Sequence, residues 1–225
     1  AVSGGLVSEK DELSSPQFTL DEIEAMADEA RRAGKRVVAL AHSAEGIMNA
    51  ILGGVKTVVS GTYLDEKICE LMVKSGMFLV PALAAKQKIA VSPHMAECTL
   101  KKIRGSIARH EEAFRTACKT GVKISFGTIS WSPLWEMKGE NAIELEYMVK
   151  AGMKSSEALV AATRTAAEDI GIENITGTVQ CGKVADLILV DGDPLDDIRV
   201  LQDKDRIMMV MKEGRIQINR GVNIT

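Results

Sequence analysis

Short apolar segments alternate with helix-type segments along most of the sequence, and this alternation constrains the fold more than any other feature. In the first repeat, Thr19 and Glu22 form a capping-box pattern that starts a helix, and an apolar, β-branched segment follows at 36–41. Apolar segments this short are typical of parallel strands that are buried on both faces. We expect further strands at 56–59, 77–83 and 122–126, and helices at 44–52, 65–74, 96–119, 141–150 and 156–170. This order predicts an α/β fold with a parallel sheet.

The pattern changes near Gly177, where helix-type segments give way to strand-type ones. Strands are expected at 184–190, 206–212 and 216–218, with Gly214 in a turn. We therefore divide the chain into a larger α/β part, 1–175, and a small C-terminal β appendage, 176–225. Residues 1–5 have the character of a strand end that enters a loop, and we expect further sequence upstream.

Composition and charge exclude several classes of partner. The 28 Lys and Arg residues nearly balance 31 Asp and Glu, which gives no electrostatic reason to expect a nucleic acid. No apolar segment approaches the roughly 18 residues that cross a bilayer. The four cysteines are scattered, with no Cys-x-x-Cys pair. We expect a cytoplasmic protein that binds a small molecule, and we leave a homo-oligomer open.

Several segments resemble the amidohydrolase superfamily, especially its imidazolonepropionase-like and Xaa-Pro dipeptidase-like members. The most specific is the C-terminal run 177–179 and 182–195, which resembles the family's closing β segment. The resemblance extends through 41–47, 60–65, 78–81, 126–128 and 139–141. It implies the C-terminal half of a (β/α)8 TIM-type barrel: strands five to eight within 1–175, the tail of strand four at 1–5, and the earlier strands upstream.

The resemblance also implies a metal site, which this chain has altered. Members of the family use zinc or a similar divalent metal at the barrel mouth to hydrolyse C–N bonds of dipeptides or cyclic amides. The ligand positions on strands five, six and eight correspond here to Leu40, Ser60 and Ile129, and Val59 stands where relatives usually carry Glu. Leu and Ile offer no donor atom. Because the turn glycines and core pattern are intact, we interpret the site as re-purposed, whether natural or engineered, and expect no metal or other cofactor on this chain.

Three polar residues are candidates for catalysis. Lys86 follows strand seven, at a position where relatives often carry Tyr; among apolar side chains its pKa would fall, which favours a Schiff-base nucleophile. Ser60 and His42 form a conceivable nucleophile and base for ester cleavage. The plain alternatives are a solvated loop lysine, a small polar filler and an inherited loop histidine. We expect His94 and His110 to be structural or solvent-facing.

The predicted pocket wall is apolar and partly aromatic. Leu40, Val59 and Ile129 replace polar or charged side chains, and Trp131 and Trp135 follow strand eight, where barrel enzymes build their active sites. These residues predict an apolar, aromatic ligand, although simple loop packing also explains the tryptophans. We expect Leu40, Ser60, Lys86 and Ile129 to surround one cavity.

Three functions remain open from the sequence. The first is the family's metal-dependent C–N hydrolysis. The second is a metal-free catalyst, either an aldolase-type lysine Schiff base or a Ser/His esterase. The third is a protein that only binds an apolar ligand. We favour an amidohydrolase-type barrel with a metal-free, re-purposed pocket.

Overall fold

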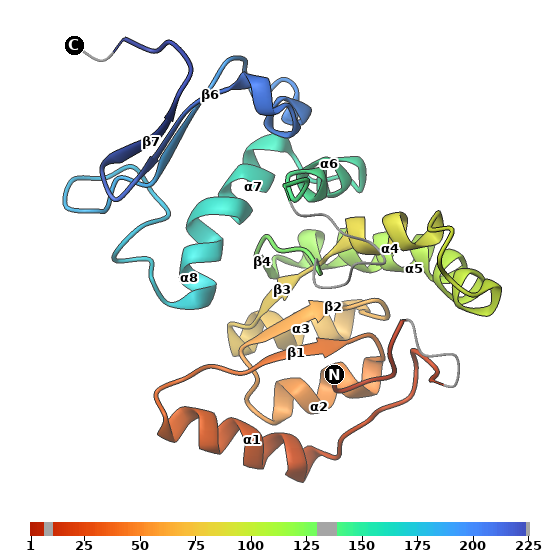
Figure 1. The fold of residues 1–225 in the computed structure, drawn as a ribbon. Coiled ribbons are helices and arrows are strands. Elements are labelled where there is room, and N and C mark those ends of the chain that lie inside the picture. The colour runs from red at the N-terminus through yellow and green to blue at the C-terminus, as the bar shows by residue number, and fades with distance from the viewer. Residues whose placement is uncertain (7–10, 130–138, 224–225) are drawn as a thin grey trace.

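A parallel sheet of four strands lies at the centre of the larger part of the chain (Figure 1). The computed structural model describes residues 1–6, 11–129 and 139–223. The strands follow one another in sequence order: β1 (Val38–Ala41), β2 (Thr57–Ser60), β3 (Phe78–Val80) and β4 (Lys123–Ile124). Sequential parallel order with intervening helices is the arrangement of a β/α fold, and the α/β prediction is confirmed.

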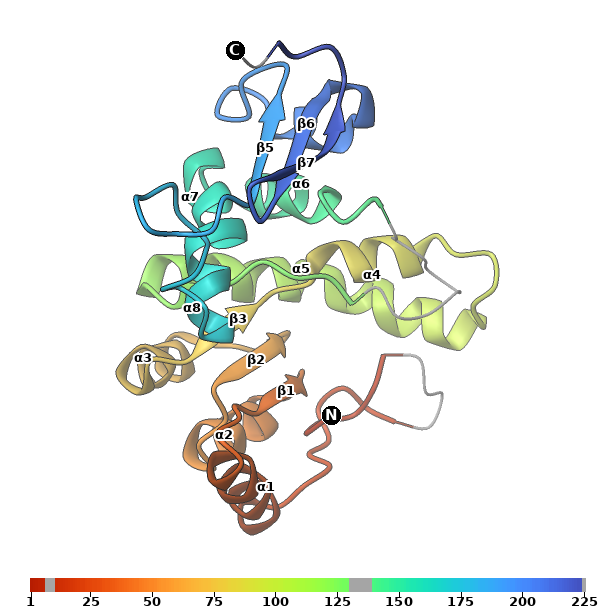
Figure 2. The same ribbon diagram turned by 60° about the vertical axis from the view of Figure 1, so that its left-hand side comes forward.

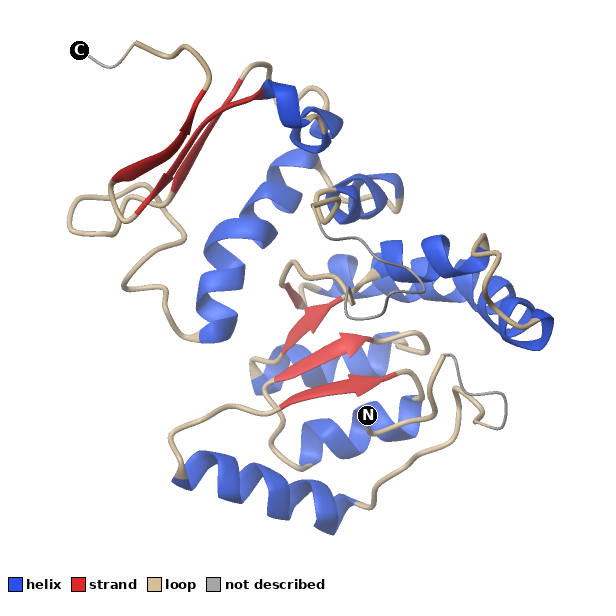
Figure 3. Ribbon diagram, in the orientation of Figure 1, coloured by secondary structure: helices blue, strands red, loops and turns tan. Residues whose placement is uncertain are grey.

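Helices alternate with these strands as the sequence predicts, and Figure 3 shows the alternation by colour. Neighbouring helices pack side by side: α1 on α2, α2 on α3, α3 on α5, and α5 on α4. The capping box of α1 is present, with the Thr19 amide donating to Glu22 Oε2 over 2.8 Å. The helices are α1 (Leu20–Arg32), α2 (Ala44–Leu52), α3 (Glu66–Ser75), α4 (Leu83–Ala90), α5 (Glu97–Thr120), α6 (Ile143–Lys150), α7 (Ser155–Val160) and α8 (Ala166–Ile170), with the π-helical turn η2 (Ala161–Thr165) between the last two.

The two faces of the sheet differ in exposure. Ala39, Ala41 and Val58 are buried, whereas Val38 is 59% exposed and Leu40 and Val59 are partly exposed. Leu40 is the Cα partner of Val59, which in turn pairs with Val80, so the three form one row across the sheet. Alternation along strands places this row on the more open face.

The strand predicted at 77–83 is wrong at its end. β3 stops at Val80, and α4 begins at Leu83. Pro81 has no N–H to continue the strand ladder, and Ala82 has φ of 51°, which turns the chain into the helix. The sequence interpretation had no helix at these residues, because it extended the strand through Pro81.

A second sheet lies in the C-terminal part, with α7 and α8 between it and the four-stranded sheet (Figure 2). It is antiparallel, and a two-residue turn at Glu213 and Gly214, both with positive φ, joins its last two strands. Its strands are β5 (Leu187–Val190), β6 (Ile207–Lys212) and β7 (Arg215–Asn219), and 3-10 turns η3 (Ile198–Gln202) and η4 (Lys204–Arg206) connect β5 to β6.

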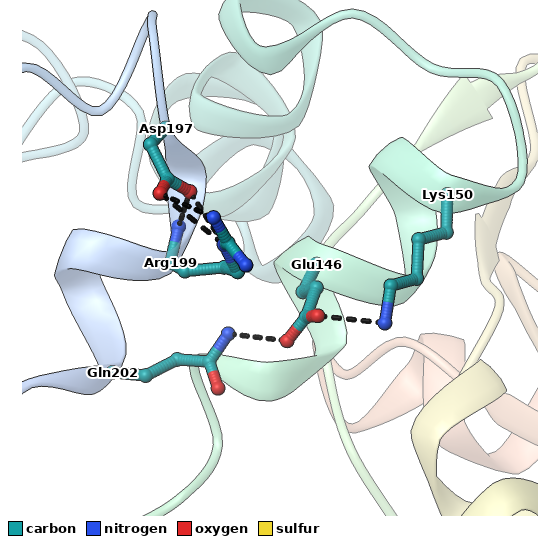
Figure 4. Close-up of polar contacts among 5 residues, drawn as sticks. All are labelled: Glu146, Lys150, Asp197, Arg199 and Gln202. Atoms are coloured by element: carbon teal, nitrogen blue, oxygen red, sulfur yellow. Dashed lines mark hydrogen bonds and ion pairs between the residues drawn. The ribbon is translucent and has the colours of Figure 1, made fainter.

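The turn η3 joins this sheet to α6. Gln202 Nε2 donates to Glu146 Oε2 over 2.8 Å, and Lys150 lies 2.7 Å from the other oxygen of the same carboxylate (Figure 4). Ile198 is buried in the core of the larger part. The turn η3 therefore ties the C-terminal sheet to the larger part of the chain by both apolar and polar contacts.

The N-terminal residues lie beside β1. The Val2 amide donates to the Leu40 carbonyl over 2.8 Å, and Ser3 forms an isolated antiparallel bridge with Pro16. The assignment of residues 1–5 to a fourth barrel strand stays a prediction, as does the boundary at 175. Within the described ranges, no helix is long and apolar enough to cross a bilayer.

Candidate functional site

The ends of β1 and β2 are fastened together just beyond the sheet. The Gly61 amide donates to the Ala41 carbonyl over 2.9 Å, and the Tyr63 amide donates to the His42 carbonyl over 3.0 Å. Gly61 has φ of 69°, a left-handed conformation that glycine adopts without strain. These two bonds place Thr62 beside His42.

The hydroxyl of Thr62 joins Lys86 to His42. Lys86 Nζ lies 2.6 Å and His42 Nδ1 lies 2.8 Å from Thr62 Oγ1. All three side chains are buried. The structure thus brings together two of the three predicted catalytic residues, through a threonine that the sequence interpretation did not include.

Lys86 lies on α4, so its placement in a loop was wrong, whereas the expected desolvation is present. Only 1% of the residue is exposed, and burial lowers its pKa from 10.5 to about 7. Within the described part of the chain, its ammonium group donates to the neutral hydroxyl of Thr62 rather than to a carboxylate. A buried lysine without a compensating charge holds a large neutral fraction near pH 7.

His42 is a neutral imidazole near neutral pH. Burial, with the nearby charge of Lys86, lowers its pKa to about 3. Its Nε2 is buried and has no hydrogen-bond partner among the described residues. A base whose conjugate acid has so low a pKa is poorly matched to proton abstraction at pH 7.

Ser60 ends β2 with φ of 82°, which is unusual for a residue other than glycine. Its Oγ is buried without a partner among the described residues, and its carbonyl oxygen lies 2.7 Å from His110 Nε2. His110 was expected to be structural or solvent-facing. It is buried, which agrees with the structural alternative, and desolvation holds its pKa well below the usual value. Its helical spacing from Ser106 and Phe114, both buried, was the available signal.

A buried glutamate holds the start of the helix that carries Lys86. The Leu83 and Ala84 amides donate to the two carboxylate oxygens of Glu144 over 2.8 and 2.7 Å. Burial raises the pKa of Glu144 to about 7 although both bonds favour the charged form. Carboxylates stabilise helix N-termini, and this one comes from α6, far along the chain, which is why sequence spacing did not reveal it.

The predicted apolar wall residues lie in two places. Leu40 and Val59 belong to the row on the open face of the sheet, and Ile129 packs against Ala84 and Ala85 of α4. Ser60 pairs instead with buried Ala41. A single cavity around Leu40, Ser60, Lys86 and Ile129 stays a prediction, and Trp131 and Trp135 lie outside the described residues.

At the three positions that the family resemblance assigns to metal ligands, the residues present do not fit a divalent metal. Of Leu40, Ser60 and Ile129, only Ser60 offers a donor atom, and a lone hydroxyl is a weak ligand for zinc. Among the described residues, no group of three or more His, Cys, Asp or Glu is placed to hold an ion. The described residues therefore give no support to a metal-dependent step.

With this geometry in place, the chain's relatives define its class. The model of the amidohydrolase family matches residues 3–217, and the chain belongs to that family. It is 32% identical over 224 residues to ochratoxinase from Aspergillus niger, a match that covers 98% of this chain and 46% of that protein. It is 31% identical over 102 residues to imidazolonepropionase from Thermoplasma acidophilum, which covers 45% of this chain and 24% of that one.

Solved structures agree with this assignment. A Xaa-Pro dipeptidase with bound methionine in its active site superposes with a TM-score of 0.88 at 34% identity, covering 97% of this chain and 53% of that one. The chain spans about half the length of these relatives. The family resemblance predicted from the sequence is confirmed, and what the whole protein does is a matter for proposal.

Proposed function

We propose that this chain contributes a metal-free site to an amidohydrolase-type barrel, and that the amine of Lys86 is its reactive group toward an apolar carbonyl compound. The observation that carries the proposal is the environment of Lys86: the side chain is buried, and its hydrogen bond goes to a neutral hydroxyl. With a pKa of about 7, close to half of this lysine is a free amine at neutral pH.

The chemistry expected of such an amine is imine formation. The nitrogen lone pair attacks the carbonyl carbon, a C–N bond forms, and the carbonyl oxygen leaves as water with the two protons of the amine. The substrate class rests on the predicted cavity, in which Leu40, Val59 and Ile129 replace polar positions by apolar ones. Burial of an apolar ligand on such a surface contributes about 25 cal/mol per Å².

The other hypotheses have weaker support. An ester hydrolase needs His42 to take a proton from Ser60, and the pKa of about 3 for His42 makes it a poor base. Metal-dependent hydrolysis of C–N bonds, the family's activity, needs donors that Leu40 and Ile129 do not supply. Binding without turnover uses the same apolar surface, and only an experiment on Lys86 separates it from imine chemistry.

The test is reductive trapping. The purified protein is incubated with 2-naphthaldehyde and sodium cyanoborohydride, and the modified peptides are identified by mass spectrometry. We expect a naphthylmethyl adduct on Lys86 that is absent in Lys86→Met and retained in Lys88→Met, since Lys88 lies on the same helix in a more exposed ion pair with Glu140. Equal labelling of surface lysines with none on Lys86 would refute the proposal. Stoichiometric zinc in the active protein would refute its metal-free part.

A further inference from the structure

We infer that Thr62 is a positioning residue of this site, which holds Lys86 and determines which ring nitrogen of His42 carries the proton. The inference rests on the proposed function only in giving Lys86 a reactive role. Its structural content, the link from lysine through hydroxyl to imidazole, stands on the contacts themselves.

Lys86 and His42 share the hydroxyl of Thr62. Thr62 Oγ1 lies 2.6 Å from Lys86 Nζ and 2.8 Å from His42 Nδ1, and Thr62 is fully buried. A threonine hydroxyl has one hydrogen to donate and lone pairs to accept. Because the hydroxyl has a single hydrogen, it can donate to only one of the two nitrogens, and leaving this buried hydrogen without an acceptor would be costly.

The charge of the lysine sets these directions. An ammonium group donates only, so Thr62 Oγ1 accepts from Lys86 and its own hydrogen goes to His42 Nδ1. The Nδ1 atom must then present a lone pair, which leaves the proton of the neutral imidazole on Nε2. When Lys86 is a free amine, the opposite order also becomes possible: His42 Nδ1 donates to Thr62, and Thr62 donates to the lysine nitrogen.

His42 therefore presents an N–H at Nε2 while Lys86 is charged. This Nε2 is the atom that is buried without a partner among the described residues. A buried N–H group without a hydrogen-bond acceptor costs free energy. The Nε2–H group of His42 can donate to the oxygen of a carbonyl ligand.

Other titratable groups around the lysine do not obscure this link. His42, after β1, and His110, on α5, interact electrostatically with Lys86, and the pKa of each is lowered so far that both are neutral near pH 7. Glu144, on α6, binds the first turn of α4, and its pKa of about 7 requires its own control. We use Glu144→Gln for this purpose.

The experiment compares Thr62→Val, which keeps the shape and removes the hydroxyl, with Thr62→Ser, which keeps the hydroxyl. Nitrogen-15 NMR of the ring nitrogens reports the tautomer of each histidine, and only three histidines are present, so His42→Gln assigns the signal. At pH 6 we expect His42 to be the Nε2–H tautomer in the parent, in Thr62→Ser and in Glu144→Gln. We expect a mixture of tautomers in Thr62→Val.

A second measurement follows Lys86. Without its hydrogen-bond acceptor the ammonium is less stable, so the midpoint of the pH profile for reductive methylation of Lys86 falls by about one pH unit in Thr62→Val and is unchanged in Thr62→Ser. If Thr62→Val does not fold, Thr62→Ala removes the same hydroxyl with less bulk.

The outcomes separate this inference from the proposed function. An unchanged tautomer and an unchanged midpoint in the variants without the hydroxyl would overturn the role of Thr62. Both changes without any naphthaldehyde adduct on Lys86 would support the role of Thr62 and refute the imine chemistry.

Discussion

Replacement of Lys86 by Met tests whether this lysine is desolvated in the folded protein. Met has a similar length and no charge. In the folded state the pKa of Lys86 is about 7, against 10.5 ordinarily, because burial disfavours the ammonium. Between these two values the unfolded chain binds a proton that the folded chain does not. The stability of the parent therefore rises with pH from about 7 toward 10.5, and is lowest, with respect to this group, below pH 7.

The magnitude follows from the size of the shift. At 1.36 kcal/mol per pH unit, a depression of this size corresponds to roughly 4 to 5 kcal/mol at pH 6. The loss of the hydrogen bond to Thr62 in Lys86→Met offsets about 1 kcal/mol of this gain in stability. We expect Lys86→Met to be more stable than the parent by roughly 3 to 4 kcal/mol at pH 6, and this advantage to shrink by roughly 2 kcal/mol between pH 7 and pH 9.

Urea unfolding followed by circular dichroism at pH 6, 7, 8 and 9 measures the difference. The difference between Lys86→Met and the parent cancels the contributions to pH-dependent stability from groups that both proteins share. Cys69, whose pKa burial raises to about 11, is one of these groups. Lys88→Met is the matched control, and it should change stability by about 1 kcal/mol or less throughout, since its ion pair with Glu140 is partly exposed. A constant difference between Lys86→Met and the parent across this range would show that Lys86 is not desolvated.

Two further substitutions test the scaffold around the site by the same unfolding assay. Glu144→Gln should lower the free energy of unfolding by about 1 to 3 kcal/mol. The loss should be larger at pH 5 than at pH 8, because the raised pKa of about 7 makes the parent less stable as pH rises from 4.5 to 7. An equal loss at both pH values would contradict the burial of Glu144. Gly61→Ala should cost at least about 1 kcal/mol more than Gly214→Ala. Both glycines have positive φ, but a Cβ at Gly61 would lie 2.7 Å from a methyl carbon of Leu64, whereas at Gly214 no atom lies within 4 Å; equal costs would show that Leu64 yields freely.

Most of the fold was predictable because its signals are local. The capping box of α1, the glycine ends of α3 and α5 and the apolar strands each depend on a few neighbouring residues, and the predicted bounds of these helices agree closely with the structure. The strands lie where they were predicted, but β3 and β4 are shorter than the predicted 77–83 and 122–126. The start of α4 was missed because its stabilising contact is not local. Its first turn has no side-chain cap of its own and depends on Glu144, which lies about sixty residues further along the chain.

The candidate site was only partly predictable because its geometry depends on pairs that are distant in sequence. Family resemblance placed Lys86, Ser60 and His42 near the site, and the predicted apolar neighbours of Lys86 suggested its desolvation. Nothing in the spacing showed that Thr62 joins Lys86 to His42, since the three residues lie on separate segments, after β1, after β2 and on α4. His110 was left as either structural or solvent-facing because its neighbours on α5 in the sequence are charged.

The contacts that shape this region explain how ligand positions can change while the fold is kept. The bonds that hold the strand ends, from Gly61 to Ala41 and from Tyr63 to His42, run between backbone atoms. His110 binds the backbone carbonyl of Ser60, and Glu144 binds backbone amides of α4. None of these contacts uses the side chain at position 40, 60 or 129. The family resemblance implies imidazole or carboxylate ligands at those positions, and substitution of such side chains leaves these supporting bonds in place.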